Sequence, residues 1–106
     1  MTHGEVRRLI GNGFPDPLTE NSVQDFEALF EELKEVKSRG YSVDNEQVKV
    51  GMVCYGASVL NSMNQPIAGV AVSLSADAIS EIGENVIVDN LNAISKKMSF
   101  RLGAEL

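Results

Sequence analysis

A stripe of apolar residues at helical spacing predicts a long helix in the first half of the chain. The stripe recurs at intervals of three and four residues, as one face of an α-helix requires, and consists of Val23, Phe26, Leu29, Phe30, Leu33 and Val36. Ser22 is predicted as the N-cap of this helix, with Asp25 three residues later in the spacing of a capping box. Gly40 is predicted to end the helix in a left-handed conformation.

A shorter helix is predicted at Glu5–Ile10, ended by Gly11 and Gly13. The segment FPDPLTENS that follows contains two prolines and several turn-forming residues. We therefore expect it to be a loop between the two helices.

Beyond Gly40 the apolar period shortens from about 3.6 to about 2 residues, which is typical of strands. Strands are predicted at Tyr41–Val43, Val50–Leu60 and Pro66–Ser75, the last two as an antiparallel hairpin around the turn NSMNQ. Helical spacing returns after Ser80.

Two glycines are expected to shape this last helix. Gly83 would kink it or delay its start, and Gly103 would end it. The predicted order is therefore two helices, three strands and one helix. This order indicates an α+β fold, an antiparallel sheet flanked by helices.

Alternation along the predicted hairpin separates an apolar face from a face of small residues. The small face consists of Met52, Cys54, Gly56 and Ser58 on one strand and Gly69, Ala71 and Ser73 on the next. Small side chains leave space, and a thiol and a hydroxyl provide weak polar groups, so this face suits a small polar ligand. On pattern alone, the favoured alternative is that a helix packs closely over these small residues.

Two single residues also have structural interpretations. Cys54, inside an apolar strand, is more often an inert buried thiol than a ligand contact. Asp44, at the end of a short strand, is usually a turn former that accepts backbone hydrogen bonds.

Composition excludes several classes of function. The chain has 106 residues, enough for one domain, and its net charge of -6 argues against direct binding of nucleic acid. A single cysteine fits a reducing compartment, and no apolar run approaches the roughly 20 residues that span a bilayer. A cytoplasmic protein is therefore expected, without membrane contact.

Motifs of enzyme chemistry are missing from the sequence. It contains no metal-ligand spacing, no phosphate-binding glycine loop and no nucleophile–base pair. We expect no enzyme activity, no metal and no cofactor.

The run LFEELKEVKSRGYSVDNEQVKVGMVCYGASV resembles the effector-binding domain of IclR-type transcriptional regulators. The positions that carry this resemblance are Arg39, Gly40, Tyr41, Asp44, Gly51 and Cys54. The later run PIAGVAVSLS is similar to the family's next strand, where the family often has serine in place of Ala71.

The resemblance implies a GAF-like α+β sensor domain that binds a small metabolite, an organic acid or an aromatic compound. It implies that the ligand-binding residues are Asp44, Met52, Cys54, Ala71 and Ser73. It also implies that residues 1–106 form a single partial sensing domain, without the helix-turn-helix domain that such regulators carry. The small molecule would control DNA binding by that separate domain.

A homo-oligomer is also expected. The alternative function is a dimerisation or interaction module without a working ligand pocket, which would pair through an exposed sheet edge or an apolar helix face.

Overall fold

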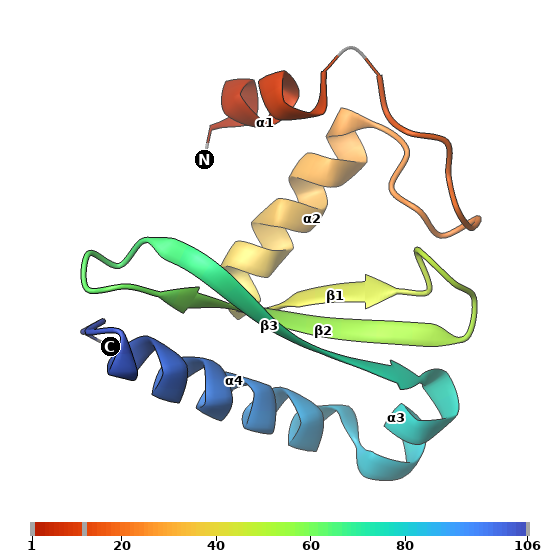
Figure 1. Ribbon diagram of the computed structural model, residues 1–106. Coiled ribbons are helices and arrows are strands. Elements are labelled where there is room, and N and C mark those ends of the chain that lie inside the picture. The colour runs from red at the N-terminus through yellow and green to blue at the C-terminus, as the bar shows by residue number, and fades with distance from the viewer. Residues whose placement is uncertain (1, 12, 106) are drawn as a thin grey trace.

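The computed structural model describes residues 2–11 and 13–105, in which four helices surround a three-stranded antiparallel sheet (Figure 1). In chain order the elements are α1 (His3–Ile10), α2 (Phe26–Arg39), β1 (Ser42–Asn45), β2 (Met52–Leu60), β3 (Pro66–Ser75), α3 (Ala76–Ile82) and α4 (Glu84–Arg101). The strands lie in the order β1-β2-β3, so β2 is the central strand. This confirms the predicted α+β fold class.

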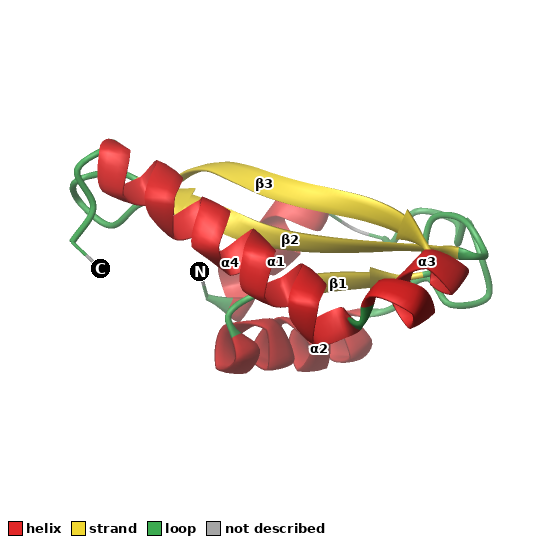
Figure 2. Ribbon diagram, turned by 90° about the horizontal axis from the view of Figure 1, so that it is seen from below, coloured by secondary structure: helices red, strands yellow, loops and turns green. Residues whose placement is uncertain are grey.

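The core lies between β2 and α4, which runs along one face of the sheet (Figure 2). Alternate residues of β2 point into it, and the buried cluster consists of Val53, Tyr55, Ile87, Val88 and Leu91. The hydroxyl of Tyr55 donates a hydrogen bond to Glu84 Oε2 over 3.2 Å. Burial, followed by this bond and the charge of Glu84, raises the pKa of Tyr55 above its ordinary value.

Helix α2 begins later than predicted, because Asp25 is its N-cap. The Asp25 side chain accepts a hydrogen bond from the backbone N–H of Ala28 over 2.8 Å. The prediction of Ser22 as the N-cap is wrong. Its hydroxyl instead accepts hydrogen bonds from Leu18 N and Thr19 N and donates one to the carbonyl oxygen of Gln47.

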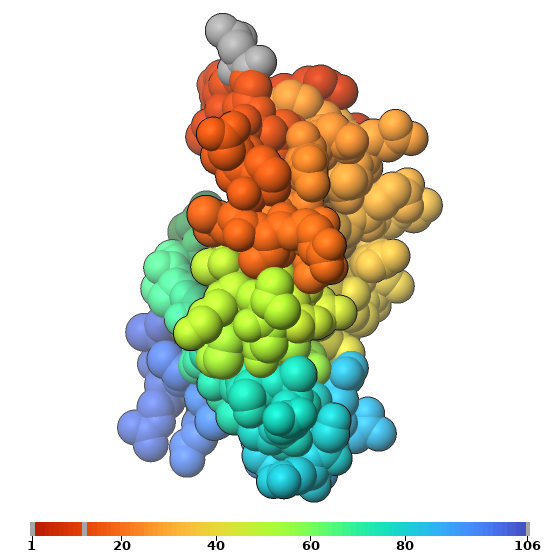
Figure 3. Space-filling model, turned by 90° about the vertical axis from the view of Figure 1, so that its right-hand side faces the viewer, coloured from red at the N-terminus to blue at the C-terminus, as the bar shows by residue number. Residues whose placement is uncertain are grey.

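The loop before α2 is therefore fastened to the turn between β1 and β2. Thr19 Oγ1 adds a second link, donating to the carbonyl oxygen of Glu46 over 2.6 Å. Figure 3 shows the orange N-terminal segment lying directly against the yellow-green turn. This contact holds the N-terminal layer against one end of the sheet.

The second half differs from the prediction in four places. The last helical region is two helices rather than one, because Gly83, at φ 97°, separates α3 from α4. Helix α3 begins at Ala76, with the Ser75 side chain as its N-cap. Strand β1 spans Ser42–Asn45 instead of Tyr41–Val43, and β2 starts at Met52 because Gly51, at φ 87°, still belongs to the turn.

One buried serine connects α4 to the sheet. Ser99 is 2% exposed, and its hydroxyl accepts a hydrogen bond from Leu60 N over 2.9 Å. We expect Ser99→Ala to lower the free energy of unfolding by about 1–3 kcal/mol, because the Leu60 N–H loses its partner. Urea denaturation would measure this loss.

Ser80→Ala is the matched control. The Ser80 hydroxyl is exposed and donates only to a carbonyl of its own helix, that of Ala76. Its loss should change stability by less than about 0.5 kcal/mol. Equal effects of the two substitutions would contradict the role assigned to Ser99.

Candidate functional site

Three of the predicted site residues form one row across the sheet. The strand register places Asp44 of β1 opposite Cys54 of β2, and Cys54 opposite Ser73 of β3. Directly opposite residues in antiparallel strands point to the same face. The thiol of Cys54 donates a hydrogen bond to the hydroxyl oxygen of Ser73 over 3.2 Å.

The other two predicted residues flank this row on the same face. Met52 lies two positions before Cys54 on β2, and Ala71 lies two positions before Ser73 on β3, opposite Gly56. All five residues therefore share the sheet face that lies away from the α4 core. The structure brings them together as neighbours on a surface, without testing whether they bind a ligand.

This face is open in the described part of the chain. Ala71 and Ser73 are exposed, while Asp44, Met52 and Cys54 are half-buried. The close packing of a helix over the small residues, which the sequence pattern alone favoured, is not found among residues 2–11 and 13–105. Cys54 is accordingly a half-buried thiol rather than a fully buried one.

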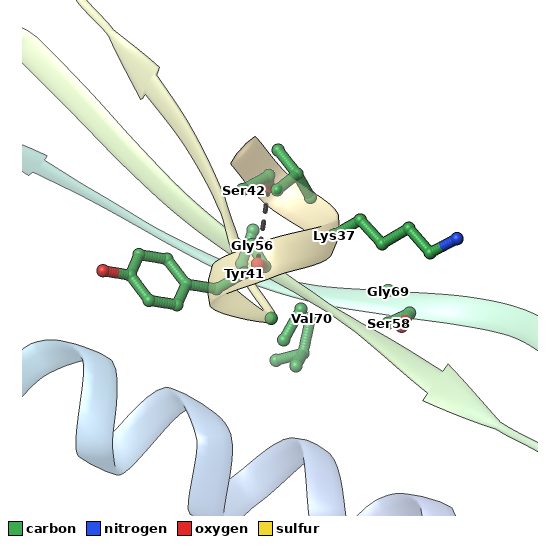
Figure 4. Close-up of a pocket in the computed structure, with 11 residues that line it drawn as sticks. Lys37, Tyr41, Ser42, Gly56, Ser58, Gly69 and Val70 are labelled. Atoms are coloured by element: carbon green, nitrogen blue, oxygen red, sulfur yellow. Dashed lines mark hydrogen bonds between the residues drawn. The ribbon is translucent and has the colours of Figure 1, made fainter. Parts of the chain in front are cut away.

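A hollow of 510 Å³ adjoins the row where the C-terminal end of α2 approaches the sheet (Figure 4). Of the five predicted residues, Ala71 lines it. Its polar groups come from Lys37, Ser42 and Ser58, and Figure 4 shows the Lys37 side chain extending toward the side where Ser58 and Gly69 lie. The hollow therefore connects the small-residue face with the ammonium group of Lys37.

Glycine at position 56 gives the hollow its shape. A Cβ atom at Gly56 would lie 2.6 Å from Ser42 Oγ, closer than real Cβ atoms come. With glycine there, the Ser42 hydroxyl can lie across the strand and donate to the carbonyl oxygen of Gly56 over 3.4 Å, as Figure 4 shows.

Two lining residues were missed by the sequence analysis. Ser42 lies two positions before Asp44 in a strand, so alternation could have placed both on one face. Lys37 lies in the last turn of α2, and no sequence signal gives the angle at which α2 meets the sheet.

Asp44 has a structural role that the sequence also indicated. Its Oδ1 accepts a hydrogen bond from the backbone N–H of Gln47 over 2.9 Å, as turn-forming aspartates do. The second carboxylate oxygen has no hydrogen bond to another described residue. Asp44 can therefore shape the turn and still present an acceptor beside the row.

The described residues offer binding groups rather than metal or membrane chemistry. Among them, no group of three His, Cys, Asp or Glu side chains is placed to hold a metal ion. No helix in this part of the chain is long and apolar enough to cross a membrane. The face supplies a thiol, hydroxyls, one carboxylate and a nearby ammonium group.

The fold and the sequence match the C-terminal domain of a family of bacterial transcriptional regulators. The sequence matches the family described as "Bacterial transcriptional regulator IclR C-terminal" over residues 2–100. The chain therefore belongs to the IclR family. The family and the relatives are transcriptional regulators and not enzymes, which confirms the expectation that this chain is not an enzyme.

Individual relatives agree with this assignment. The HTH-type transcriptional regulator KdgR of Escherichia coli is 31% identical over 99 residues, which is 93% of this chain and 38% of KdgR. The crystal structure of the Agobacterium tumefaciens repressor BlcR matches with a TM-score of 0.90 and 34% identity, covering 100% of this chain and 42% of BlcR. The C-terminal domain of E. coli KdgR matches with a TM-score of 0.87 and 27% identity, covering 97% of this chain and 63% of that structure.

These matches confirm the family resemblance and the fold. The chain spans between 31% and 38% of the lengths of the first three curated relatives.

The role of Asp44 in the turn can be tested apart from any ligand. We expect Asp44→Ala to lower the free energy of unfolding by about 1 kcal/mol, because the part-buried N–H of Gln47 loses its acceptor. Asp44→Asn keeps an acceptor oxygen and should retain most of the stability. Urea denaturation of both variants distinguishes the two causes, and equal losses would show that charge, not the hydrogen bond, is what matters.

Proposed function

We propose that this chain is the ligand-sensing portion of an IclR-family transcriptional regulator and that its open sheet face binds a small organic acid or aromatic metabolite. The observation that carries the proposal is the row of Asp44, Cys54 and Ser73 across three strands, in which Ser73 is exposed and the other two are half-buried. A thiol, a hydroxyl and a carboxylate converge there on a surface made otherwise of small residues. In small-molecule sites a small number of such polar groups fixes the orientation of the ligand.

The chemistry of the face fits a flat ligand that has a carboxylate beside Lys37 and a hydrogen-bond donor beside the Asp44 carboxylate. The Lys37 ammonium and the hydroxyls of Ser42 and Ser73 can donate hydrogen bonds to a carboxylate. Gly56 and Ala71 leave a level surface between these groups, on which an aromatic or short aliphatic body can lie. The proposed binding residues are Asp44, Met52, Cys54, Ala71 and Ser73, extended by Lys37 and Ser42.

Regulation would follow if the ligand binds one arrangement of the regulator more tightly than another. A ligand that prefers one arrangement of the whole regulator increases the population of that arrangement and so changes its affinity for DNA. The DNA contact would come from a separate helix-turn-helix domain, since this chain carries a net charge of -6. We propose accordingly that residues 1–106 are one partial sensing domain of a cytoplasmic protein.

Exposed apolar side chains favour a second function, in which this domain is an interaction module. Val86, Ile94 and Met98 of α4 are 51%, 50% and 42% exposed. Such residues on one helix are typical of a surface that another chain covers. The two functions are compatible, because the apolar residues lie on the opposite side of the sheet from the proposed ligand site.

An amide NMR titration of the chain with pools of small organic acids and aromatic metabolites tests the proposed ligand site. We expect saturable shifts clustered at Asp44, Cys54 and Ser73. Ser73→Ala should weaken binding of the active compound by about 10- to 150-fold, because one hydrogen bond to a charged group contributes about 1.5–3 kcal/mol.

Ser80→Ala is the control for this substitution, since Ser80 is also exposed but lies on α3. The Ser80→Ala variant should bind the active compound as tightly as the parent chain does. A well-dispersed spectrum that no pool perturbs, or a Ser73→Ala variant that binds as tightly as the parent, would overturn the assignment of the site.

A further inference from the structure

Gln47 is held by hydrogen bonds from three separate parts of the chain. Its backbone N–H donates to Asp44 Oδ1 over 2.9 Å, and its carbonyl oxygen accepts a bond from the hydroxyl of Ser22. Its side-chain Nε2 donates to Glu32 Oε1 of α2 over 3.2 Å. Asp44 belongs to the candidate ligand site, whereas Ser22 and Glu32 belong to the loop before α2 and to α2 itself. Gln47 therefore joins the candidate site to these two N-terminal segments.

The turn that carries Gln47, residues 46–51, is also closed by hydrogen bonds of its own. Glu46 N donates to the carbonyl oxygen of Met52 over 3.1 Å, and Gly51 N donates to Glu46 Oε1 over 2.7 Å. Because the two ends of the turn are tied together, a displacement of Gln47 has to move the turn as a whole.

The backbone of this turn is strained at Glu46, whose φ of 59° lies in the left-handed region. That conformation is unfavourable for residues other than glycine, and it persists where the surroundings over-determine it. The surroundings here include the loop before α2. Thr19 Oγ1 donates to the carbonyl oxygen of Glu46 over 2.6 Å, and the Ser22 hydroxyl donates to that of Gln47. The loss of a loop contact should therefore loosen the turn.

We propose that Gln47 is a positioning residue for the Asp44 carboxylate and couples the candidate ligand site to α2 and the loop before it. Through its N–H it fixes Oδ1 of that carboxylate, and it leaves Oδ2 for a hydrogen-bond donor of the ligand. Its role in binding rests on the proposed function, in which Asp44 contacts the ligand.

Ligand binding and the N-terminal contacts should favour each other. A donor of the ligand that bonds Oδ2 of Asp44 holds the carboxylate where Oδ1 meets the Gln47 N–H, and Ser22 and Glu32 hold Gln47 in that same place. Coupling of binding free energies is reciprocal, so breaking these contacts weakens ligand binding by the factor by which the ligand strengthens them. In the whole regulator, occupancy of the site would change how firmly the loop and α2 are held.

Amide hydrogen exchange of the chain without ligand tests the coupling. The reporter is the N–H of residue 47, which is bonded to Asp44. We expect Ser22→Ala to raise its exchange rate about tenfold, because one lost hydrogen bond changes a local opening equilibrium by about that factor.

Ser99→Ala is the matched control for a general loss of stability. The bond that it removes, from Leu60 N, lies at the opposite end of β2 from the turn. It should leave the exchange rate at residue 47 unchanged, because that amide exchanges through opening of the turn and not of the whole domain.

A swap of two side chains tests the link to α2. Gln47→Glu places a second carboxylate against Glu32, and two ionised carboxylates share no donor. It should raise the exchange rate of the amide at position 47 about tenfold, after correction for the intrinsic rates of the two side chains. Adding Glu32→Gln restores one donor and one acceptor with the polarity reversed, and should return the rate to within about twofold of the parent chain.

Three results would overturn the coupling. The first is an amide at position 47 that exchanges at the parent rate in both Ser22→Ala and Gln47→Glu. The second is an equal response of that amide to Ser99→Ala. The third is a double variant that exchanges as fast as Gln47→Glu alone.

The consequence for binding is measured with the compound that shifts Asp44, Cys54 and Ser73 in the titration. Ser22→Ala should raise its Kd about threefold to tenfold, although Ser22 lies in the loop before α2 and not on the sheet. An unchanged Kd would contradict the coupling. If no compound binds the parent chain, the proposed function fails, whereas the exchange rates still decide whether Gln47 positions Asp44.

Discussion

The packing of α4 across β2 is the interaction on which the other features of this domain depend. Val53 and Tyr55 of the central strand fill the space under Ile87 and Leu91 of the helix. Burial of each such side chain contributes about 1.5–3 kcal/mol. Because this contact occupies the apolar face of the sheet, the opposite face needs no covering helix. Among the described residues, the small-residue face takes no part in this core.

Local rules in the sequence accounted for the elements and for the faces of the strands. The left-handed conformation predicted for Gly40 is confirmed, with φ 85° and ψ 8°. Alternation placed Cys54 and Ser73 on one face, because a strand offers only two directions to its side chains. The N-cap was wrong because serine and aspartate both cap helices. What decided between Ser22 and Asp25 was a bond from Ser22 to Gln47, 25 residues away.

The site residues on the strands could be predicted from the sequence, but the position of α2 beside them could not. The family resemblance named Asp44, Ala71 and Ser73, and the register of the sheet made them neighbours of one another. The approach of Lys37 depends on the direction of α2, which is set by contacts of the preceding loop far along the chain. Whether a helix covers the small residues is likewise a tertiary property, and among residues 2–11 and 13–105 no helix packs closely over them.

The alternation along β2 has a consequence for how such a domain changes over generations. Residues that stabilise the fold, such as Tyr55, and residues proposed to contact the effector, such as Cys54, are adjacent in sequence but face opposite directions. Substitutions at exposed positions such as Ala71 and Ser73 remove little packing and should cost little stability. With the proposed site, changes of ligand preference would therefore not require compensating mutations in the core. Divergent ligand preference on a constant scaffold is the expected outcome.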